Sequence, residues 1–418
     1  EISLGLVGSE MCIRDRLVLE NNNIRFIFSH CQQCGFCENV CPTRAILMHQ
    51  RNDGLSDIII EQDKCIRCQK CIKVCPSVNS ELSKEYLSSL FNKKYYLGYN
   101  QDELIRRESS SGGVCKTLII EGLESGYVDG VYSLKKCEEY PQAKSEFYTS
   151  QNIPSYFDIP NSVYHSVMMG RHFKKVGKCN RLMIVGTPCQ LKVMEKMLKD
   201  KYQELIKVCI FCKQQKTLNS TRFLAKVMKT KVPVNLLFTV CYRGKGWPGI
   251  VNVDGAQLSW NKAAQLPFGR RLWTVPGCNI CGDPFGMEAN ADITLMDPWI
   301  IRGANDLGET LITVHTEKGL SLLQRVPNLT LMPQKYNDIE PALGLTDIRR
   351  KRELVPYFRG EACTRRIRWA GRMEQLQRKY LQTVVGGLPS LPFIFYRVMC
   401  KLPDLSLIHI WRCRRLVE

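Results

Sequence analysis

The segment H-C-Q-Q-C-G-F-C-E-N-V-C-P, residues 30–42, specifies the structure of the first part of this chain, because its pattern returns as K-C-I-R-C-Q-K-C-I-K-V-C-P at residues 64–76. Both copies read C-x2-C-x2-C-x3-C-P, and they supply eight cysteines: Cys31, Cys34, Cys37, Cys41, Cys65, Cys68, Cys71 and Cys75. Three thiolates on a tight loop bind three irons of a 4Fe–4S cubane. The fourth, placed ahead of proline, reaches across to a second cubane.

This crossed arrangement predicts two 4Fe–4S clusters in a two-cluster bacterial ferredoxin-like module. One cluster would be bound by Cys31, Cys34, Cys37 and Cys75, and the other by Cys65, Cys68, Cys71 and Cys41. Zinc is the alternative, but it prefers two CxxC pairs. The segment D-I-I-I-E, residues 57–61, suits the short strand that joins the two halves. Such a module relays electrons without substrate chemistry, so we expect the rest of the chain to use them.

The composition is that of a soluble globular protein. The chain has 418 residues, of which 44% are hydrophobic and 24% charged, and this length allows two or three domains. We find no apolar run long enough for a transmembrane helix and expect a cytoplasmic location. Twenty-one cysteines without a credible signal peptide indicate metal sites rather than disulfides. The formal net charge of +19 partly reflects counting cysteines as neutral, because each oxidised 4Fe–4S centre with its thiolates carries about −2.

Both ends of the sequence resemble translated sequencing-adapter read-through, so we expect residues 1–16 and 405–418 to be artefactual and to have no function. The remaining chain is expected to be α+β, with four parts. These are the ferredoxin module (17–90), two parts of a larger α/β flavin-binding domain (91–175 and 176–360), and a basic helical segment (361–404).

The large domain begins where strand and helix patterns alternate. K-Y-Y-L-G-Y, residues 94–99, is typical of a strand, and the loop S-S-S-G-G, residues 109–113, leads into an amphipathic helix. A hydroxyl- and glycine-rich loop at a helix start presents free N–H groups to an anion, but it is equally an ordinary N-cap. Neither a Rossmann fingerprint nor a Walker A motif is present.

Cys189 follows the strand at residues 182–185 and opens a helix in V-G-T-P-C-Q. A thiol at a helix N-terminus has a lowered pKa, which suits either a nucleophile or a metal ligand. Two further pairs, Cys209 with Cys212 and Cys278 with Cys281, stand at a strand end and in a turn. Four such cysteines could converge on one metal centre.

The motifs S-S-S-G-G-V, N-S-V-Y-H-S, V-G-T-P-C-Q, I-F-C, Y-R-G-K-G-W, C-N-I-C-G-D and A-D-I-T-L-M-D-P-W occur in this order between residues 94 and 360. In this order they resemble the family of the coenzyme F420 hydrogenase/dehydrogenase β subunit. The resemblance implies an FAD-bearing domain with its own 4Fe–4S centre, ligated by Cys189, Cys212, Cys278 and Cys281, with Cys209 as the weaker substitute for Cys212. It also places a set of residues along the flavin: Ser109, Ser110, Ser111, Gly112, Gly113, Ser162, Tyr164, Ser166 and, near the ring, Thr187.

Two departures from the family pattern bear on the substrate. The last motif reads Met296-Asp297-Pro298-Trp299 where the family usually has Gly-Asp, and the extra cysteine at 209 is atypical. Similar proteins also occur in gene clusters for cell-surface polysaccharides. The resemblance therefore implies a hydride acceptor or donor that is either coenzyme F420 or another organic molecule.

Residues 349–379 carry eleven Lys or Arg against three acidic residues. They fit a solvated basic helix, or a docking surface for an acidic redox partner or a phosphorylated substrate. No nucleic-acid-binding fold is recognisable. His165 and His172 lie near the expected site, and we expect a core or surface role for both.

Three functions remain open from the sequence. The first is an iron–sulfur flavoprotein oxidoreductase that passes electrons between clusters and FAD, in which no side chain acts as nucleophile. The second is an electron-transfer subunit of a larger hydrogenase or dehydrogenase complex, without its own substrate site and with a partner protein. The third is a zinc-stabilised binding protein.

Overall fold

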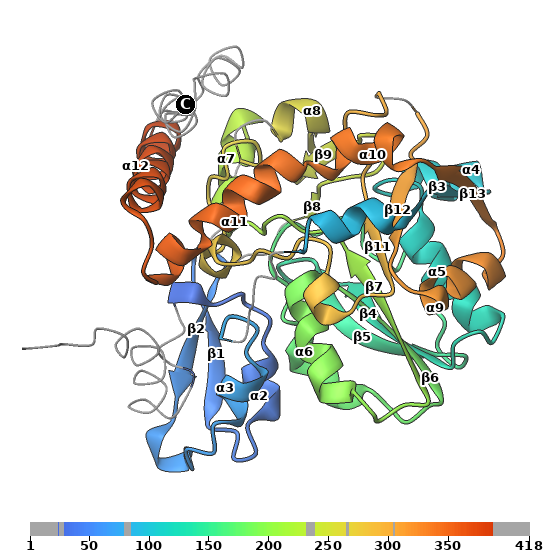
Figure 1. Cartoon of the computed structure of the whole chain (residues 1–418), viewed down its shortest axis with the longest axis horizontal. Helices are drawn as coiled ribbons and strands as arrows, with labels where there is room; N and C mark the ends of the chain where they lie inside the picture. The colour runs from blue at the N-terminus through green and yellow to red at the C-terminus, as the bar shows by residue number, and fades with distance from the viewer. Residues whose placement is uncertain are drawn as a thin grey trace, which may run out of the picture.

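The computed structural model describes Ile24 and residues 29–78, 85–230, 239–264, 267–303 and 306–387, the side chains of 384–387 excepted. A small module at the N-terminus is followed by a large domain built on an eight-stranded sheet and then by helices that return along it (Figure 1). The two expected read-through segments, residues 1–16 and 405–418, lie outside the described residues.

The N-terminal module is built from two short helices and a hairpin. Helices α2 (Phe36–Val40) and α3 (Lys70–Val74) each begin after the second cysteine of their motif and contain the third. Strands β1 (Ile46–Gln50) and β2 (Ser56–Ile60) pair antiparallel with Ile46 opposite Ile60. The strand expected near residues 57–61 is therefore present as the second arm of this hairpin. A short 3₁₀ turn, η2 (Gln62–Lys64), leads into the second cysteine loop.

The sheet of the large domain has the order β13-β3-β12-β11-β7-β6-β4-β5. Its strands are β3 (Lys94–Asn100), β4 (Gly130–Lys136), β5 (Ala143–Thr149), β6 (Arg181–Gly186), β7 (Glu204–Ile210), β11 (Ile293–Met296), β12 (Thr310–Val314) and β13 (Leu329–Gln334). The central strands β4, β6, β7 and β11 are parallel, and the strands outside them pair antiparallel. The expected α/β domain is thus a mixed sheet.

Helices cover both faces of this sheet because its strands alternate buried side chains between the two sides. Met183 and Val185 of β6 pack with helices α5 (Val114–Glu124) and α9 (Glu317–Arg325) on one face. Leu182 and Ile184 pack with helix α6 (Pro188–Leu198) on the other. Helix α4 (Glu103–Glu108) lies beside β3.

A second, three-stranded antiparallel sheet, which the sequence patterns did not predict, has the order β10-β9-β8. Its strands are β8 (Val240–Cys241), β9 (Ile250–Val253) and β10 (Ala256–Ser259), and they share an apolar core with α7 (Leu218–Val227) and α8 (Trp260–Ala263). Four 3₁₀ turns connect the elements: η3 (Ser88–Asn92), η4 (Met169–Lys175), η5 (Pro276–Asn279) and η6 (Met287–Ala289).

The chain then forms helices α10 (Tyr336–Leu343), α11 (Leu345–Arg359) and α12 (Arg365–Gly387). This agrees with the expected helical C-terminal segment, although the helices begin before residue 361. Figure 1 shows α11 crossing the molecule above the N-terminal module, with α12 beyond it. In the described part of the chain, no helix combines the length and apolarity needed to cross a membrane.

The N-terminal module is fixed to the large domain by backbone contacts beside its first cysteine loop. The Gly170 amide donates to the Cys34 carbonyl at 2.9 Å, and the Gly277 amide donates to the Cys31 carbonyl at 3.1 Å. A Cβ atom on Gly277 would lie 2.5 Å from the His30 carbonyl oxygen, so the two backbones meet where only glycine fits. Phe36 completes this contact by packing edge-on against Phe173.

Candidate iron–sulfur centres and flavin cavity

The first predicted cysteine set gathers inside the N-terminal module. Cys75 comes from the end of the second motif, yet it lies close enough to Cys31, Cys34 and Cys37 to act on all three thiols electrostatically. Burial, followed by the nearby Cys75, raises the pKa of Cys31 to about 12. In the protein without iron these thiols are therefore protonated, and a cationic iron centre would displace their protons.

The second predicted set lies nearer the surface. Cys68 is exposed, Cys65 and Cys41 are half-buried, and Cys71 is buried beside Cys68. Although burial opposes it, hydrogen bonds from Thr43 and Ala45 lower the pKa of Cys41. This set thus has more contact with solvent than the first.

The third predicted set comes from three separate loops at one edge of the sheet. Cys189 opens α6, Cys212 follows β7, and Cys278 and Cys281 lie in and after η5. Cys189 acts electrostatically on Cys281 and Cys278, and Cys212 acts on Cys278, Cys189 and Cys281. The structure therefore brings the four thiols together.

The position of Cys189 at a helix N-terminus predicts a lowered pKa for its thiol, and this prediction is wrong. Thr187 and Gln190 form a capping box at the start of α6, and the Thr187 hydroxyl lies 3.4 Å from the Cys189 sulfur. Burial, together with Cys281, nevertheless raises the pKa of Cys189 well above its ordinary value. Desolvation outweighs the helix dipole, so a nucleophilic thiolate is disfavoured here.

Cys209 occupies a different environment from Cys212. It is completely buried on β7 in the apolar cluster with Phe36, Leu182 and Ala289, and a Cβ on Gly286 would lie 2.7 Å from its sulfur. Among the described residues no group of three His, Cys, Asp or Glu side chains is close enough to hold a single metal ion. Ligands to a cubane stand farther apart than ligands to one ion, so this absence applies to mononuclear sites only.

The basic C-terminal helices hold the loop that carries Cys278 and Cys281. Arg352 donates to the Gly282 carbonyl at 2.7 Å, and Arg378 donates to the Asn279 side chain at 2.8 Å. Glu374, only 4% exposed, forms ion pairs with Arg271 at 3.2 Å, with Arg350 at 3.0 Å and with Arg378. We call this group, with Glu374 at its centre, the helical clamp.

Lys351 of α11 lies beside the third cysteine set. Its ammonium group donates to the Lys213 carbonyl at 2.6 Å and interacts electrostatically with Cys281, Cys278 and Cys212. Burial lowers the pKa of Lys351, while the three thiols oppose that shift. A cation at this position would offset part of the negative charge of a bound cluster.

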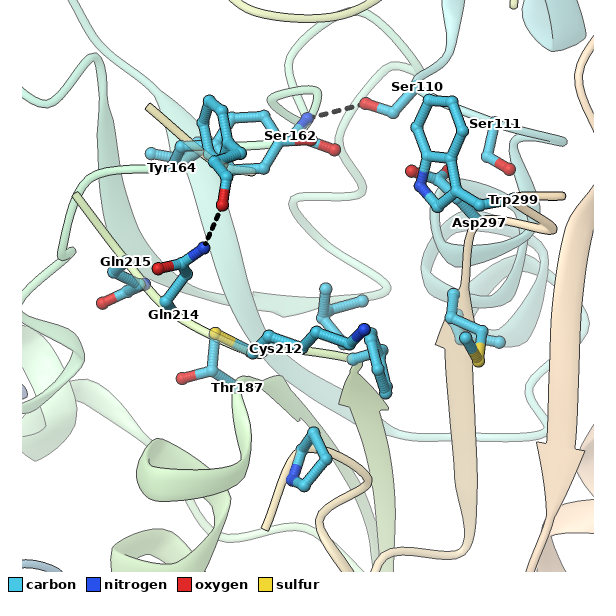
Figure 2. A pocket seen from close by; sticks show the side chains of 18 of the residues that line it. Ser110, Ser111, Ser162, Tyr164, Thr187, Cys212, Gln214, Gln215, Asp297 and Trp299 are labelled. Atoms are coloured by element: carbon cyan, nitrogen blue, oxygen red, sulfur yellow. Dashed lines mark hydrogen bonds between the residues drawn. The ribbon is translucent and has the colours of Figure 1, made fainter. Parts of the chain in front are cut away.

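A cavity of about 790 Å³ opens next to the third set, within the size range of about 300–1,000 Å³ that is usual for ligand sites. Its walls include Cys212 and seven of the nine residues expected along the flavin, namely Ser109, Ser110, Ser111, Gly113, Ser162, Tyr164 and Thr187. Figure 2 shows Thr187 and Cys212 on one side and Ser110 and Ser111 across the cavity. The Ser162 amide donates to the Ser110 hydroxyl at 2.7 Å.

The other two expected residues lie behind the cavity wall. Gly112 packs against the neighbouring strands, where a Cβ would lie 2.3 Å from the Gly98 carbonyl oxygen. The Ser166 hydroxyl donates to the side chain of Gln215 at 2.7 Å. His165 is also a core residue, because its ring is fully buried and bonded to the Lys216 carbonyl and the hydroxyls of Thr221 and Tyr242.

A buried ion pair that sequence reasoning missed supports the cavity wall. Arg243, completely buried, contacts Asp297 at 2.6 Å and donates to the hydroxyl of Tyr164 and the carbonyl of Ser110. Although burial opposes the charge, Asp297 raises the pKa of Arg243 above its ordinary value. Its guanidinium group also lies 5.4 Å from the ring of Trp299. The signal was present, because Y-R-G-K-G-W and M-D-P-W contain the two partners.

Lys116 was also not predicted. It lies in the first turn of α5, lines the cavity, is 6% exposed, and makes no hydrogen bond or ion pair with any described residue. Burial, with help from Lys136, lowers its pKa to about 8. The N-cap of α5 is Gly113, whose φ of +79° favours glycine. An unpaired lysine beside a helix start and three serines is suited to an anionic group, as in the diphosphate of a dinucleotide.

The three cysteine sets and the cavity form a continuous series. Cys71 of the second set acts electrostatically on Cys37 of the first. Cys34 of the first set acts electrostatically on Cys189 of the third set, and Cys212 of the third set lines the cavity. Iron centres on these thiols would therefore connect the N-terminal module to the cavity.

Models of known protein families match both the N-terminal module and the large domain. The model described as coenzyme F420 hydrogenase/dehydrogenase, beta subunit N-term, matches residues 95–168, and the model for the C terminus of that subunit matches residues 179–332. Two models of the 4Fe–4S dicluster domain match residues 30–79 and 57–115.

Among solved structures, the chain is similar to one from the F420-reducing [NiFe] hydrogenase complex of Methanosarcina barkeri, with 16% identity and a TM-score of 0.45. That comparison covers 63% of this chain and 90% of the other. No curated protein matches the sequence.

Proposed function

Because the chain belongs to the family of coenzyme F420 hydrogenase/dehydrogenase β subunits, an oxidoreductase family, we propose that it is an iron–sulfur flavoprotein. It would pass electrons between 4Fe–4S clusters and FAD bound in the cavity of the large domain. The observation that carries this proposal is the contiguity of the third cysteine set with both the N-terminal module and the cavity.

The chain's residues fit these groups. Four thiols from three loops, buried at Cys278 and half-buried at the other three positions, suit a third 4Fe–4S centre. The crossed set Cys31, Cys34, Cys37 and Cys75 suits one of the two module clusters. Lys116 and the Ser109–Ser111 loop would bind the diphosphate of FAD, and Thr187 would lie near its ring system. When bound, the clusters supply one-electron transfer and the flavin couples it to the two-electron chemistry of an organic molecule.

The side chains of this chain then act by binding and positioning. The Arg243–Asp297 pair holds the serine loop against Tyr164, and the helical clamp holds the loop of Cys278 and Cys281. We propose that coenzyme F420 or another organic hydride carrier is the second substrate. The cavity supports a flavin site in this chain. Reaction of that flavin with a small hydride carrier, rather than with a partner protein alone, distinguishes the proposed function from that of a pure electron-transfer subunit.

Anaerobic purification tests the proposal. We expect about twelve irons and one flavin per chain, since three cubanes hold four irons each. Cys189→Ser should remove about four irons and leave the eight of the module. Cys363→Ser, at a half-buried cysteine outside all three sets, is the matched control and should leave the iron content unchanged. Zinc in place of iron, or equal iron in both variants, would contradict the proposal.

The substrate is tested on the same preparation. Addition of reduced coenzyme F420 should bleach the flavin absorbance of the isolated chain. If the flavin is present but does not respond, while dithionite bleaches it, another organic molecule or a partner protein is the electron donor.

A further inference from the structure

The second cysteine loop is the outermost part of the iron–sulfur series. Cys68 is exposed and the neighbouring Ile66 is 64% exposed, whereas Cys31 of the first set is buried. Electron transfer between proteins requires close approach of the two centres. The protein surface over this loop is thus where electrons can enter or leave the module with the shortest path.

This loop is also strongly basic. Lys64, Arg67, Lys70 and Lys73 are all exposed and alternate with the predicted ligands Cys65, Cys68 and Cys71, whereas the first loop carries Glu38 and no Lys or Arg between its cysteines. Lys64 forms an ion pair with Glu61 at 2.6 Å.

Helix α6 extends the positive charge beyond the loop. It packs beside α3, and its exposed Lys196 acts electrostatically on Cys75. We call Lys64, Arg67, Lys70, Lys73 and Lys196 the outer basic surface.

The other basic region of the chain is less suited to binding a partner. The sequence left open whether residues 349–379 form a docking surface, but several of their arginines are bound within the protein. Arg350 and Arg378 contact Glu374, Arg352 donates to Gly282, and Arg359 donates to the Ile280 carbonyl. Their charges serve the helical clamp.

We propose that the outer basic surface docks an acidic one-electron carrier protein, such as a small acidic ferredoxin. This proposal rests on the proposed function, since it requires a cluster on Cys65, Cys68, Cys71 and Cys41. In each encounter the reduced carrier loses one electron and this cluster gains it, with no bond or proton transferred; the reverse transfer uses the same surface. Carboxylates of the carrier would pair with the exposed cations, and the apolar Ile66 would lie at the centre of the contact.

The test measures binding of a purified acidic bacterial ferredoxin to the iron-loaded chain by anaerobic titration calorimetry. We expect the triple variant R67E/K70E/K73E to weaken binding about tenfold or more, and 0.5 M salt to weaken binding of the unaltered chain similarly. The control R365E/R366E/R368E makes the same charge change at exposed positions of α12 and should bind as the unaltered chain does. If the loop variant loses iron, K196E on α6 replaces it, with about a threefold weakening expected.

The iron content of each sample separates the possible failures. An unaltered chain without iron–sulfur clusters would refute the proposed function. An iron-loaded chain that does not bind the ferredoxin, that binds equally in all variants, or that is weakened only by the α12 substitutions would overturn the docking proposal and leave the proposed function standing.

Discussion

Replacing Asp297 with asparagine should be far more costly than its position at the end of a short strand suggests. The substitution keeps the shape of the side chain but leaves the Arg243 guanidinium, 0% exposed, without its counter-charge, whereas the Asp297 side chain is 18% exposed. Breaking a buried ion pair by removing one partner costs about 3–5 kcal/mol. Because Arg243 is the more deeply buried member, we expect Asp297→Asn to lie in that range.

Removing both charges should cost less than removing one. In the double variant R243M/D297N no uncompensated charge remains, although the contacts of Arg243 with Ser110 and Tyr164 are lost. Urea unfolding followed by tryptophan fluorescence measures the effect, and Trp260 and Trp299 lie beside the pair as reporters. The exposed Asp63→Asn is the control. A D297N variant whose free energy of unfolding lies within about 1 kcal/mol of that of the unaltered chain, or a double variant less stable than D297N, would show that the buried Arg243 charge does not depend on Asp297.

Three other predictions test separate parts of the structure. Gly277→Ala should weaken the contact between the N-terminal module and the large domain, because the new Cβ would lie 2.5 Å from a backbone oxygen. Faster proteolysis between the two parts would reveal this. Gly303→Ala, with open space around it, should have no effect. Glu374→Gln should destabilise the helical clamp by about 3 kcal/mol and remove iron selectively from the third set, which iron analysis and EPR would detect, while the exposed Glu353→Gln should not. The affinity of the flavin-free chain for FAD should fall as the pH rises above about 8, because Lys116 loses its proton there. The substitution Lys116→Met should make this affinity low and independent of pH in this range. A pH profile unchanged by the substitution would exclude this role of Lys116.

Without a bound ligand, Lys116 makes the stability of the folded protein increase with pH above about pH 8. Its folded-state pKa of about 8 lies below its ordinary value of 10.5, so the charged form is disfavoured in the folded protein. Below pH 8 this residue therefore lowers the free energy of unfolding by its full amount, and the effect declines to zero as the pH rises toward 10.5. Anion binding would reverse the trend, because a bound phosphate favours the charged lysine.

The parts of the fold that local sequence specifies were predictable. The expected strands near residues 94–99 and 182–185 are β3 and β6, the strand expected to end at Cys209 and Cys212 is β7, and the loop before α5 was expected from its serines and glycines. The pairing of β3 with β12 and β13 was not, because it joins segments more than 200 residues apart and no local pattern selects the partner. These pairings make the strands on that side of the sheet antiparallel.

The sequence predicted the cysteines of the candidate site, but not the ion pairs that hold the surrounding loops in place. Cysteines mark metal sites by their chemistry, whereas Arg243 is one of many arginines and only folding pairs it with Asp297. Charge count alone also suggested a solvated or docking role for the C-terminal helices, since the sequence does not reveal that Glu374 lies among three arginines. The pKa of Cys189 was mispredicted because the helix-terminus rule neglects burial.

The helical clamp has a consequence for how the protein is made. All eight module cysteines lie before residue 78, but the loop of Cys278 and Cys281 is held by residues 350–378. During synthesis, N-terminal units fold first. The module can therefore accept its iron while the ribosome is still translating the large domain, whereas the third site is complete only after nearly the whole chain has emerged. We expect chains that terminate before α12 to contain the two module clusters and lack the third.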